Sequence, residues 1–506
     1  MVFYYAVSTY HVLCCVLHRL TREPDQKAVL YISDAPVTTT LNLKRYRESG
    51  IFDEVHVLEE LETRKYSIQL ERKKMPIKQV MDKCCKRMQK TVPLRHMQEA
   101  ETMYIGLDTL PFGWYVAKQK LPYVLFEDGN GILSNKALFM ATMRPGSVRE
   151  LAIEHFGLLG ENPQAKAILA DTQTQQPGYK NPKMVDFSAK RILAEMNPET
   201  RRRVLAFFGC EEKKELPQTK TSLLLTQHLA NMNYMPLEQQ HKLYLLLADY
   251  FLQGQTLVIK PHPDDIAGRY RELFGEDTQI LPLAMPSELL PYCVAERFGT
   301  VLAASSTSTK SFADMADKAL WFEARIHQDF LHMHRYYVAA QLLKQLCPGG
   351  RVFTNANHQL LSELGSVQAD YTEDFVDAQA DCLVISDALE GDLQTNTAIF
   401  LNERRRHLYF NGTNQDVFAN IRPIVIDKNP EAEEVIYVYS ENPEILRKAE
   451  EFQHEIALPH CGITLHAQGI GAEERLKIKV LEGMLEATEA RLRDYIAMHK
   501  KAGDTA

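Results

Sequence analysis

Short apolar runs alternate with longer segments of helical spacing along the first half of the chain. Helix-length segments separate the runs rich in β-branched and aromatic residues, which occupy 2–7, 28–32, 54–58, 103–105 and 123–126. The first run ends at Ser8 and Thr9, which offer an N-cap to a segment whose apolar positions extend from Val12 to Leu20. This alternation predicts strands that form a parallel sheet, with helices covering both of its faces.

The same alternation resumes after a charged, proline-containing stretch at 195–220. Apolar strand candidates follow it at 222–226, 257–259 and 300–303. We therefore predict an N-terminal Rossmann-like lobe at 1–210 and a second Rossmann-like lobe at 215–346.

A third α/β region, without a repeat or a catalytic motif, is predicted at 350–506. It follows Cys347-Pro-Gly-Gly350 and has strand candidates at 382–386, 435–440 and 463–467. A helix from Ala472 to about Met498, with apolar residues near helical spacing and many charges, is expected to close this region. The predicted fold class is thus α/β, with two parallel-sheet lobes and an additional C-terminal α/β region that ends in a long helix.

Length and charge limit the function classes. A chain of 506 residues, of which 45% are hydrophobic, has room for two or three globular domains. The formal net charge of −8 argues against a general nucleic-acid binder, which normally carries a basic excess, so an anionic ligand must be held by local groups. The nine cysteines show neither a C-x-x-C motif nor a His/Cys metal spacing, and no apolar run reaches the ~18 residues of a membrane-spanning helix. We therefore expect a soluble cytoplasmic protein and assign no metal.

Two adjacent carboxylates, Glu127 and Asp128, come directly after the strand candidate at 123–126. Open α/β sheets bind ligands at the carboxyl ends of their strands, so either carboxylate could face a cleft and accept a proton. Gly129 and Gly131 would let the backbone turn sharply there. An exposed Asp-Gly turn is the alternative explanation of the same stretch.

A second strand candidate delivers Lys260 and His262 at its carboxyl end, in the sequence Lys-Pro-His-Pro-Asp-Asp. The flanking Pro261 and Pro263 restrict the backbone of the histidine, and a rigid histidine at a strand end suits the binding of a phosphate. A turn in which the histidine only caps the strand would have the same sequence.

Two further features fit a nucleotide ligand. Hydroxyl residues fill 305–309, beginning with Ser305, Ser306 and Thr307, between a strand candidate and a helical pattern, where hydroxyls and free amides bind phosphate. Glu288 could accept hydrogen bonds from both hydroxyls of a ribose. Taken alone, the hydroxyls are explained by helix capping and the glutamate by a first-turn position in a helix.

The order of these motifs resembles that of the bacterial sialyltransferases, whose shared motifs are Asp/Glu-Asp/Glu-Gly, His-Pro and Ser-Ser/Thr. The opening Tyr5-Ala-Val-Ser-Thr-Tyr-His-Val-Leu13 is also similar to the first strand and turn of the family that contains the lipooligosaccharide sialyltransferases; polysialyltransferase-like families share the motifs. The resemblance covers about residues 1–330. It implies a GT-B-like pair of lobes, and inverting transfer of sialic acid from CMP-sialic acid to a hydroxyl of a bacterial surface glycan, either lipooligosaccharide or capsule.

The resemblance also implies a role for each candidate residue. Glu127 or Asp128 would be the general base for the acceptor hydroxyl, and His262 would stabilise the charge of the departing phosphate. The donor would be held by Lys260 near the cytidine, Glu288 on the ribose, and Ser305 and Ser306 at the phosphate. Pro263 and Thr307 would also be donor-binding residues. CMP is a good leaving group without a metal, and the sequence has no clear Asp-x-Asp motif, so no cofactor is expected.

Other functions are open at this point. Capsule β-Kdo transferases also carry Glu-Asp-Gly and Lys-Pro-His-Pro-Asp motifs, so CMP-Kdo is an alternative donor. A CDP-alcohol phosphotransferase of teichoic-acid type uses a similar Lys-x-His-Pro segment. The non-enzymatic alternative is a nucleotide-binding partner protein of a glycan-synthesis complex.

Two segments of the chain could contact binding partners. The basic stretch at 72–95 could attract anionic lipid at the inner face of the membrane or an anionic glycan acceptor, although a solvated helix face is the simpler explanation. The final helix could pack against another element or mediate a homodimer.

Overall fold

The structure is a computed structural model that describes most of the chain. The described ranges are 1–36, 42–127, 143–173, 181–210, 220–276, 278–294, 297–305, 307–322, 325–372, 380–386, 397–401 and 420–471, with positions 40, 140, 488, 491 and 493. The chain forms two compact units: unit 1 is Met1–Asn231 with Gln255–Trp321, and unit 2 is Met232–Gly254 with Phe322–Ala506. The domain boundaries expected from the sequence stay a prediction.

The first sheet of unit 1 has seven parallel strands in the order β3-β2-β1-β4-β5-β6-β7. In chain order they are β1 Val2–Ala6, β2 Ala28–Ser33, β3 Glu54–Leu58, β4 Thr102–Ile105, β5 Tyr123–Phe126, β6 Ala165–Ala170 and β7 Met184–Asp186. Successive side chains of β1 point to opposite faces, because Phe3 and Tyr5 belong to one buried core and Tyr4 belongs to the other.

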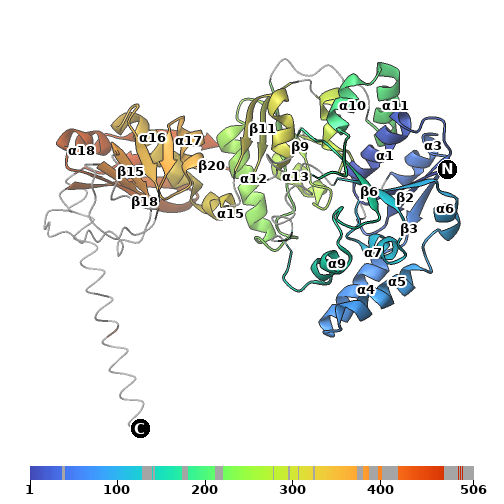
Figure 1. The fold of residues 1–506 in the computed structure, drawn as a ribbon. Coiled ribbons are helices and arrows are strands. Elements are labelled where there is room, and N and C mark those ends of the chain that lie inside the picture. The colour runs from blue at the N-terminus through green and yellow to red at the C-terminus, as the bar shows by residue number, and fades with distance from the viewer. Residues whose placement is uncertain are drawn as a thin grey trace, which may run out of the picture. The chain divides into compact units, whose positions relative to one another are not determined.

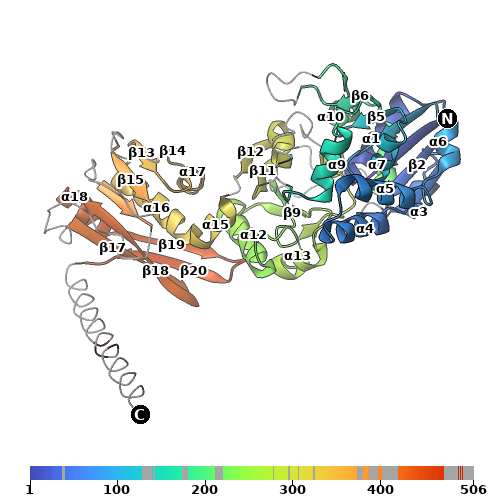
Figure 2. The same cartoon turned by 60° about the horizontal axis from the view of Figure 1, so that its bottom comes forward.

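Helices cover both faces of this sheet, as Figure 1 and Figure 2 show. The core of Phe3 and Tyr5 is completed by α4 Leu61–Arg72, α5 Ile77–Met88, α6 Leu94–Glu99, α7 Pro111–Lys118 and α9 Val148–Phe156. The core of Tyr4 is completed by α1 Thr9–Thr21, α3 Leu43–Glu48, α10 Ala189–Glu195 and α11 Pro198–Phe208. Ser8 caps α1 as predicted, since its side-chain oxygen accepts a hydrogen bond of 3.2 Å from the backbone N–H of His11.

The second sheet of unit 1 has five parallel strands in the order β10-β9-β8-β11-β12. In chain order they are β8 Thr221–Leu225, β9 Thr256–Lys260, β10 Gln279–Ile280, β11 Phe298–Ala303 and β12 Ala316–Trp321. The helical elements of this lobe are α13 Ala267–Phe274, η2 Ser287–Leu289, α14 Leu290–Cys293 and η3 Thr307–Met315. The strand order reverses direction at β8, so the space between the carboxyl ends of β8 and β11 is the switch point where such sheets bind ligands.

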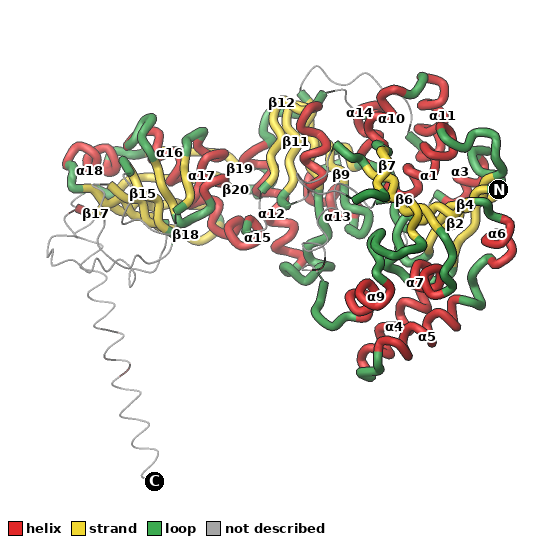
Figure 3. The backbone as a smooth tube through the Cα atoms, viewed as in Figure 1, coloured by secondary structure: helices red, strands yellow, loops and turns green. Residues whose placement is uncertain are grey.

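Unit 2 is built on a mixed sheet in the order β14-β13-β15-β16-β18-β17-β20-β19, drawn in yellow in Figure 3. The first four strands pair in parallel and the rest pair antiparallel. They are β13 Val352–Thr354, β14 Ala369–Tyr371, β15 Cys382–Ile385, β16 Thr397–Phe400, β17 Ile421–Asn429, β18 Glu431–Ser440, β19 Gln453–Leu458 and β20 Ile463–Gly469. Its helical elements are α12 Leu237–Phe251, α15 Ile326–Asp329, η4 Phe330–His332, α16 Met333–Leu346, α17 His358–Gly365 and α18 Pro443–Glu450.

Much of the predicted basic stretch belongs to helix α5, which is amphipathic. Its apolar side buries Val80, Cys84 and Met88 in the core, whereas Lys83 and Lys86 are exposed. The basic residues of this helix therefore form its solvent face.

Two parallel-sheet Rossmann-like lobes and a further α/β region confirm the predicted GT-B-like fold class. The helix expected from Ala472 to about Met498 lies outside the described residues, and the described part of that region is a mixed sheet. No helix within the described ranges is both long and apolar enough to cross a bilayer.

Candidate active site

Polar residues follow three neighbouring strands of the second sheet, at the point where each strand ends. Thr226, Gln227 and His228 follow β8, His262 follows β9, and Ser305 follows β11. Because these strands are adjacent and parallel, their carboxyl ends lie on one edge of the sheet. These residues are therefore candidates to line the switch point between β8 and β11.

His262 is held in one tautomer by its own turn. The backbone N–H of Asp264 donates to Nδ1 of His262 at 3.1 Å, so Nδ1 is an acceptor and the ring hydrogen of the neutral imidazole is on Nε2. Burial first, and then the neighbouring His228, lower the pKa of His262 to about 4. His262 is therefore a neutral donor through Nε2 at physiological pH.

The backbone on either side of His262 is tied to the end of β8. Its N–H donates to the hydroxyl of Thr226 at 3.3 Å, and that hydroxyl donates to the carboxylate of Asp265 at 3.0 Å. Asp265 is buried and also accepts a hydrogen bond from the hydroxyl of Tyr270. This network fixes the turn that the two prolines restrict, which leaves the imidazole little freedom of position.

The end of β8 also joins His262 to the end of β11. The ring of His228 lies against that of His262, with centroids 4.1 Å apart and planes tilted by 33°. The hydroxyl of Ser305 donates to the side-chain oxygen of Gln227 at 2.7 Å. His262 and Ser305, which the sequence placed in one phosphate site, thus both contact the dipeptide at 227–228.

Lys260 and Glu288 form a second pair of sequence-predicted residues. Lys260 ends β9, is 6% exposed, and donates from Nζ to the carbonyl oxygen of Pro261 at 2.8 Å. Burial lowers the pKa of Lys260 to about 8, although the negative charge of Glu288 acts in the opposite direction. Burial instead raises the pKa of Glu288. A backbone hydrogen bond, the hydroxyl of Ser287 and the charge of Lys260 partly offset this rise. Each charge therefore stabilises the other inside the protein.

Glu127 lies directly after β5 and is buried, with 3% of its surface exposed. Its backbone N–H donates to the carbonyl oxygen of Leu169 at 3.0 Å, which fixes its position beside β6. Burial raises the pKa of Tyr10 well above its ordinary value, and the nearby charges of Cys14, Glu288 and Glu127 raise it further. Tyr10 is thus a neutral phenol whose surroundings include carboxylates from both lobes of unit 1.

Tyr10 owes its position to the close packing of α1 against the end of β4. Gly106 follows β4, and a Cβ atom on it would lie 2.6 Å from Cγ of His11. Only glycine fits this approach, which seats the first turn of α1 over the carboxyl edge of the sheet.

The structure describes the remaining sequence-predicted residues only in part. Asp128 and Ser306 lie outside the described residues, and of Thr307 only its backbone, at the start of η3, is described. Pro263 follows His262 directly and is half-buried. The catalytic and binding roles of all nine residues stay predictions.

Two features of this site were missed in the sequence. Gln227 and His228 follow a buried strand in the same way as His262 does, so the same argument could have found them. The Nδ1 atom of His228 is buried and, among the described residues, has no hydrogen-bond partner. No local signal points to Tyr10, because its neighbours Glu127 and Glu288 are remote in sequence.

The ligand atoms of His228, His262 and Asp264 lie within 4.8 Å of one another. A divalent ion could in principle bridge them, yet Nδ1 of His262 already accepts a backbone hydrogen bond and Asp264 is exposed. His262, whose Nε2 carries the ring hydrogen, is better suited to donate a hydrogen bond to an anion than to bind a cation.

Unit 2 has a cavity of its own, of about 300 Å³. It lies where β15 and β16 end, beside α15 and α16, and its lining includes Arg325, Asp329, Arg335 and Ser386. None of the sequence-predicted site residues lines it.

Two Rossmann-like lobes, with a neutral histidine, hydroxyls and a buried lysine at one sheet edge, are the arrangement expected of a nucleotide-sugar-dependent glycosyltransferase. The family model described as alpha-2,8-polysialyltransferase matches residues 5–308. The chain belongs to this family, and it is a sialyltransferase that uses CMP-sialic acid and acts on glycans.

Solved structures with a similar fold include bacterial sialyltransferases. The α/β-galactoside α-2,3-sialyltransferase of Photobacterium phosphoreum is 10% identical, with a TM-score of 0.38, over 65% of this chain and 94% of that one. The 2,6-sialyltransferase of a Photobacterium species, solved with CMP and lactose, is 10% identical with a TM-score of 0.40, over 73% and 78%. The UDP-GlcNAc 2-epimerase of Methanocaldococcus jannaschii is 13% identical with a TM-score of 0.32, over 64% and 85%. No curated protein was similar enough to this chain to count as a match.

Proposed function

We propose that this enzyme transfers sialic acid from CMP-sialic acid with inversion, and that its acceptor is a hydroxyl of a bacterial surface glycan, either lipooligosaccharide or capsule. The family description supports an acceptor that itself ends in sialic acid, joined through an α-2,8 linkage. It also favours sialic acid over Kdo as the donor sugar, and it favours sugar transfer over CDP-alcohol phosphotransfer.

The observation that carries the proposal is the fixed tautomer of His262 beside the β8–β11 switch point. As sialic acid leaves, negative charge grows on the phosphate of CMP, and a donor already aimed at that charge lowers the barrier. Nε2–H of His262 is such a donor, since Nδ1 is occupied by the N–H of Asp264. It needs no proton uptake to act, because the imidazole is neutral with a pKa of about 4.

The other donor-side residues surround the same edge. Ser305, with Ser306 and Thr307, would bind the phosphate through hydroxyls and the amides at the start of η3. Lys260 would lie near the cytidine, Pro263 would also belong to the donor site, and Glu288 would accept hydrogen bonds from the ribose hydroxyls. The burial of Lys260 and the favourable charge interaction between Lys260 and Glu288 support a rigid nucleoside site.

On the acceptor side, Glu127 would be the general base, and Asp128 is the alternative. The burial of Glu127 supports this role, because a carboxylate shielded from water is a better proton acceptor than an exposed one. The neutral hydroxyl of Tyr10 would then donate to a carboxylate or to the acceptor sugar near both lobes.

No metal or other cofactor takes part in this scheme. We further propose a cytoplasmic enzyme that meets the inner face of the membrane through the exposed basic side of α5, where anionic lipid or an anionic acceptor would bind. A homodimer is consistent with the predicted final helix.

The test is the pair Glu127→Gln and Asp128→Asn, assayed for release of CMP and for binding of CMP. Removal of the base should abolish transfer while CMP binding survives, because the donor groups come from the second sheet. Glu154→Gln, an exposed glutamate on α9, is the matched control and should transfer sialic acid normally. Normal transfer in both test variants would contradict the assignment of a base to this stretch.

A further inference from the structure

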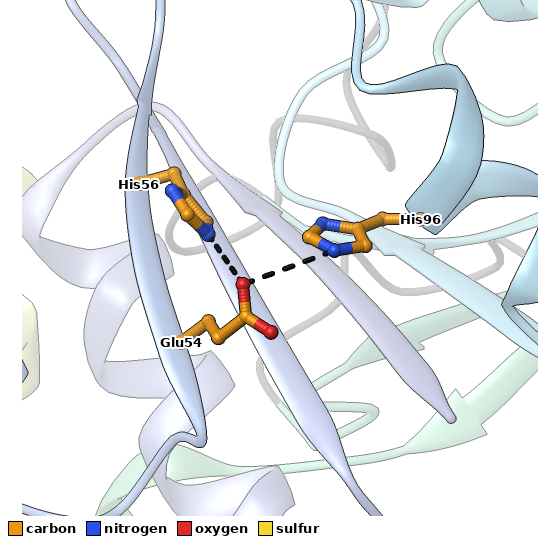
Figure 4. A group of neighbouring side chains, drawn as sticks. All are labelled: Glu54, His56 and His96. Atoms are coloured by element: carbon orange, nitrogen blue, oxygen red, sulfur yellow. Dashed lines mark hydrogen bonds and ion pairs between the residues drawn. The ribbon is translucent and has the colours of Figure 1, made fainter.

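Two histidines and a glutamate converge on the first sheet of unit 1, as Figure 4 shows. Glu54 and His56 alternate on β3, so both side chains point to the same face of this edge strand. His96 comes from α6. Nε2 of His56 and Nε2 of His96 lie 2.9 and 3.8 Å from one and the same oxygen of Glu54.

This group is placed away from the sugar-transfer site. Glu54 is the first residue of its strand, at the amino end of a parallel sheet, whereas Glu127 follows the carboxyl end of β5 in the same sheet. Ligands of open α/β sheets bind at the carboxyl edge, whereas this cluster lies toward the amino edge.

The donor set fits a transition-metal ion. Two imidazole nitrogens and one carboxylate oxygen, with a water, are a common coordination for Zn²⁺. Tetrahedral bonds of about 2.0–2.1 Å place ligand atoms roughly 3.3 Å apart. The observed separations of 2.9 and 3.8 Å bracket that value, and all three ligand atoms lie within 4.8 Å of one another.

A tyrosine of the neighbouring strand supports both histidines. The hydroxyl of Tyr31 lies 2.9 Å from Nδ1 of His96, and its ring stacks on that of His56 at a centroid distance of 5.0 Å. A phenol that accepts the Nδ1 hydrogen of His96 leaves the lone pair of Nε2 free for a metal, which is the usual arrangement behind a metal-bound histidine.

An ordinary ion pair explains less of this geometry. Glu54 already has a basic partner, since Nζ of Lys27 lies 3.3 Å from its other oxygen. His56 alone would complete the charge pairing, since its Nε2 lies 2.9 Å from the carboxylate of Glu54. A second histidine turned toward the same oxygen, with its Nδ1 paired to a tyrosine, is the feature that a metal site requires and an ion pair does not.

We propose that Glu54, His56 and His96 form a Zn²⁺-binding site that joins strand β3 to helix α6 and stabilises the first sheet. The side chains are 36%, 40% and 18% exposed, respectively, so a hydrated ion can reach them and keep a water as a fourth ligand. Imidazole nitrogens select Zn²⁺ over Mg²⁺ and Ca²⁺, which prefer sites made of oxygen.

The test is a Zn²⁺ titration of the full chain, freed of metal with a chelator, in competition with a chromophoric indicator. The variants are His56→Gln and His96→Gln. We expect each to weaken Zn²⁺ binding by roughly 100-fold or more, because a side chain that binds the metal directly should matter at least as much as one that supports it. Tyr31→Phe keeps the ring and loses the hydroxyl, and it should weaken binding by about 10–100-fold. Mg²⁺ should not compete.

Two controls separate this site from other histidines. His466 pairs with Glu455 at 3.2 Å, and His466→Gln should bind Zn²⁺ as the unmodified chain does. His228→Gln removes one member of the second group of potential ligands and should also leave this site intact. Zn²⁺ should raise the melting temperature of the unmodified chain but not that of His96→Gln.

Three outcomes would overturn the proposal. They are no Zn²⁺ binding by the unmodified chain, equal affinity in the unmodified chain and His96→Gln, and loss of the site only in His228→Gln. Circular dichroism of each variant checks that it is folded, and Tyr31→Phe supplies a mild change if a histidine variant is not.

Discussion

His262 can be tested by replacing each of its two nitrogens separately. In His262→Asn the amide oxygen takes the place of Nδ1 and can still accept from the N–H of Asp264, while the donor at Nε2 is lost. In His262→Gln the amide NH₂ reaches about as far as Nε2, while the turn loses its acceptor. The first variant thus keeps the fold of the turn, and the second keeps the contact to the donor phosphate.

The expected magnitudes differ for the two roles. Loss of one preorganised donor to a developing charge costs roughly 10²–10³ in kcat, which sets the expectation for His262→Asn. The hydrogen bond of 3.1 Å to the N–H of Asp264 contributes about 0.5–1.5 kcal/mol to stability, which sets the expectation for His262→Gln. His262→Gln should therefore turn over faster than His262→Asn although it is the less stable of the two.

The assay is the initial rate of CMP release at saturating donor and acceptor, with urea unfolding of the same preparations. If His262→Asn were as active as the unmodified chain and His262→Gln were inactive, the histidine would act by shaping the turn. That result would refute the assignment of His262 to the phosphate.

Three more predictions rest on single residues. Ser305→Ala removes the hydrogen bond to Gln227 and a proposed phosphate ligand. The KM for the donor should therefore rise by about 10-fold, corresponding to about 1.4 kcal/mol. An unchanged KM would count against a role of Ser305 in binding the donor phosphate. The pH profile of kcat/KM should show no protonation of His262 between about pH 5 and 8, because the pKa of this histidine is about 4. A fall in kcat/KM below about pH 6.5 that disappears in His262→Gln would contradict this. His18 is buried, and burial lowers its pKa to about 4, against about 6.5 in the unfolded chain. Between these values the unfolded chain takes up a proton that the folded chain excludes. The free energy of unfolding should therefore fall by about 2–3 kcal/mol as the pH drops from 7 to 4.5. His18→Phe should flatten that dependence in urea unfolding, and an unchanged slope would show that another group causes it.

The sequence was most informative about the strands of the two parallel sheets. Buried strands read as apolar runs, and the predicted bounds of β5 agree with the structure. The predicted bounds of β3 also agree, because this edge strand alternates polar and apolar residues. Strands β6 and β7 were not predicted, because the first carries Lys166 in a short apolar run and the second is only three residues long and largely exposed. Such strands form because their backbones pair with a neighbour, which local pattern does not show.

The long strand β18 illustrates the same limit. Its predicted start at 435 falls short of Glu431, since the first residues are charged. In the structure Glu434 is nearly buried and forms ion pairs with Arg335 and Lys428. Those partners come from α16 and from β17, so only the tertiary structure explains an acidic start to this strand.

Part of the candidate site could be predicted, because the ends of buried strands can be recognised in the sequence as the ends of apolar runs. Lys260, His262 and Ser305 each follow a buried run, and the sheet order then places His262 and Ser305 in contact with Gln227 and His228. Gln227 and His228 also follow a buried run, but the order of parallel strands cannot be read from local pattern, so their contacts with Ser305 and His262 could not be predicted.

The central claim is that this chain transfers sialic acid from CMP-sialic acid, and a donor screen tests it most directly. The full chain would be incubated with CMP-sialic acid, CMP-Kdo or CDP-glycerol and an acceptor ending in α-2,8-linked sialic acid, and the elongated product would be measured together with CMP release. The account predicts one sialic acid added for each CMP released from CMP-sialic acid, with little or no product from the other two donors. Faster transfer from CMP-Kdo or CDP-glycerol, or CMP binding without elongation of the acceptor, would contradict it.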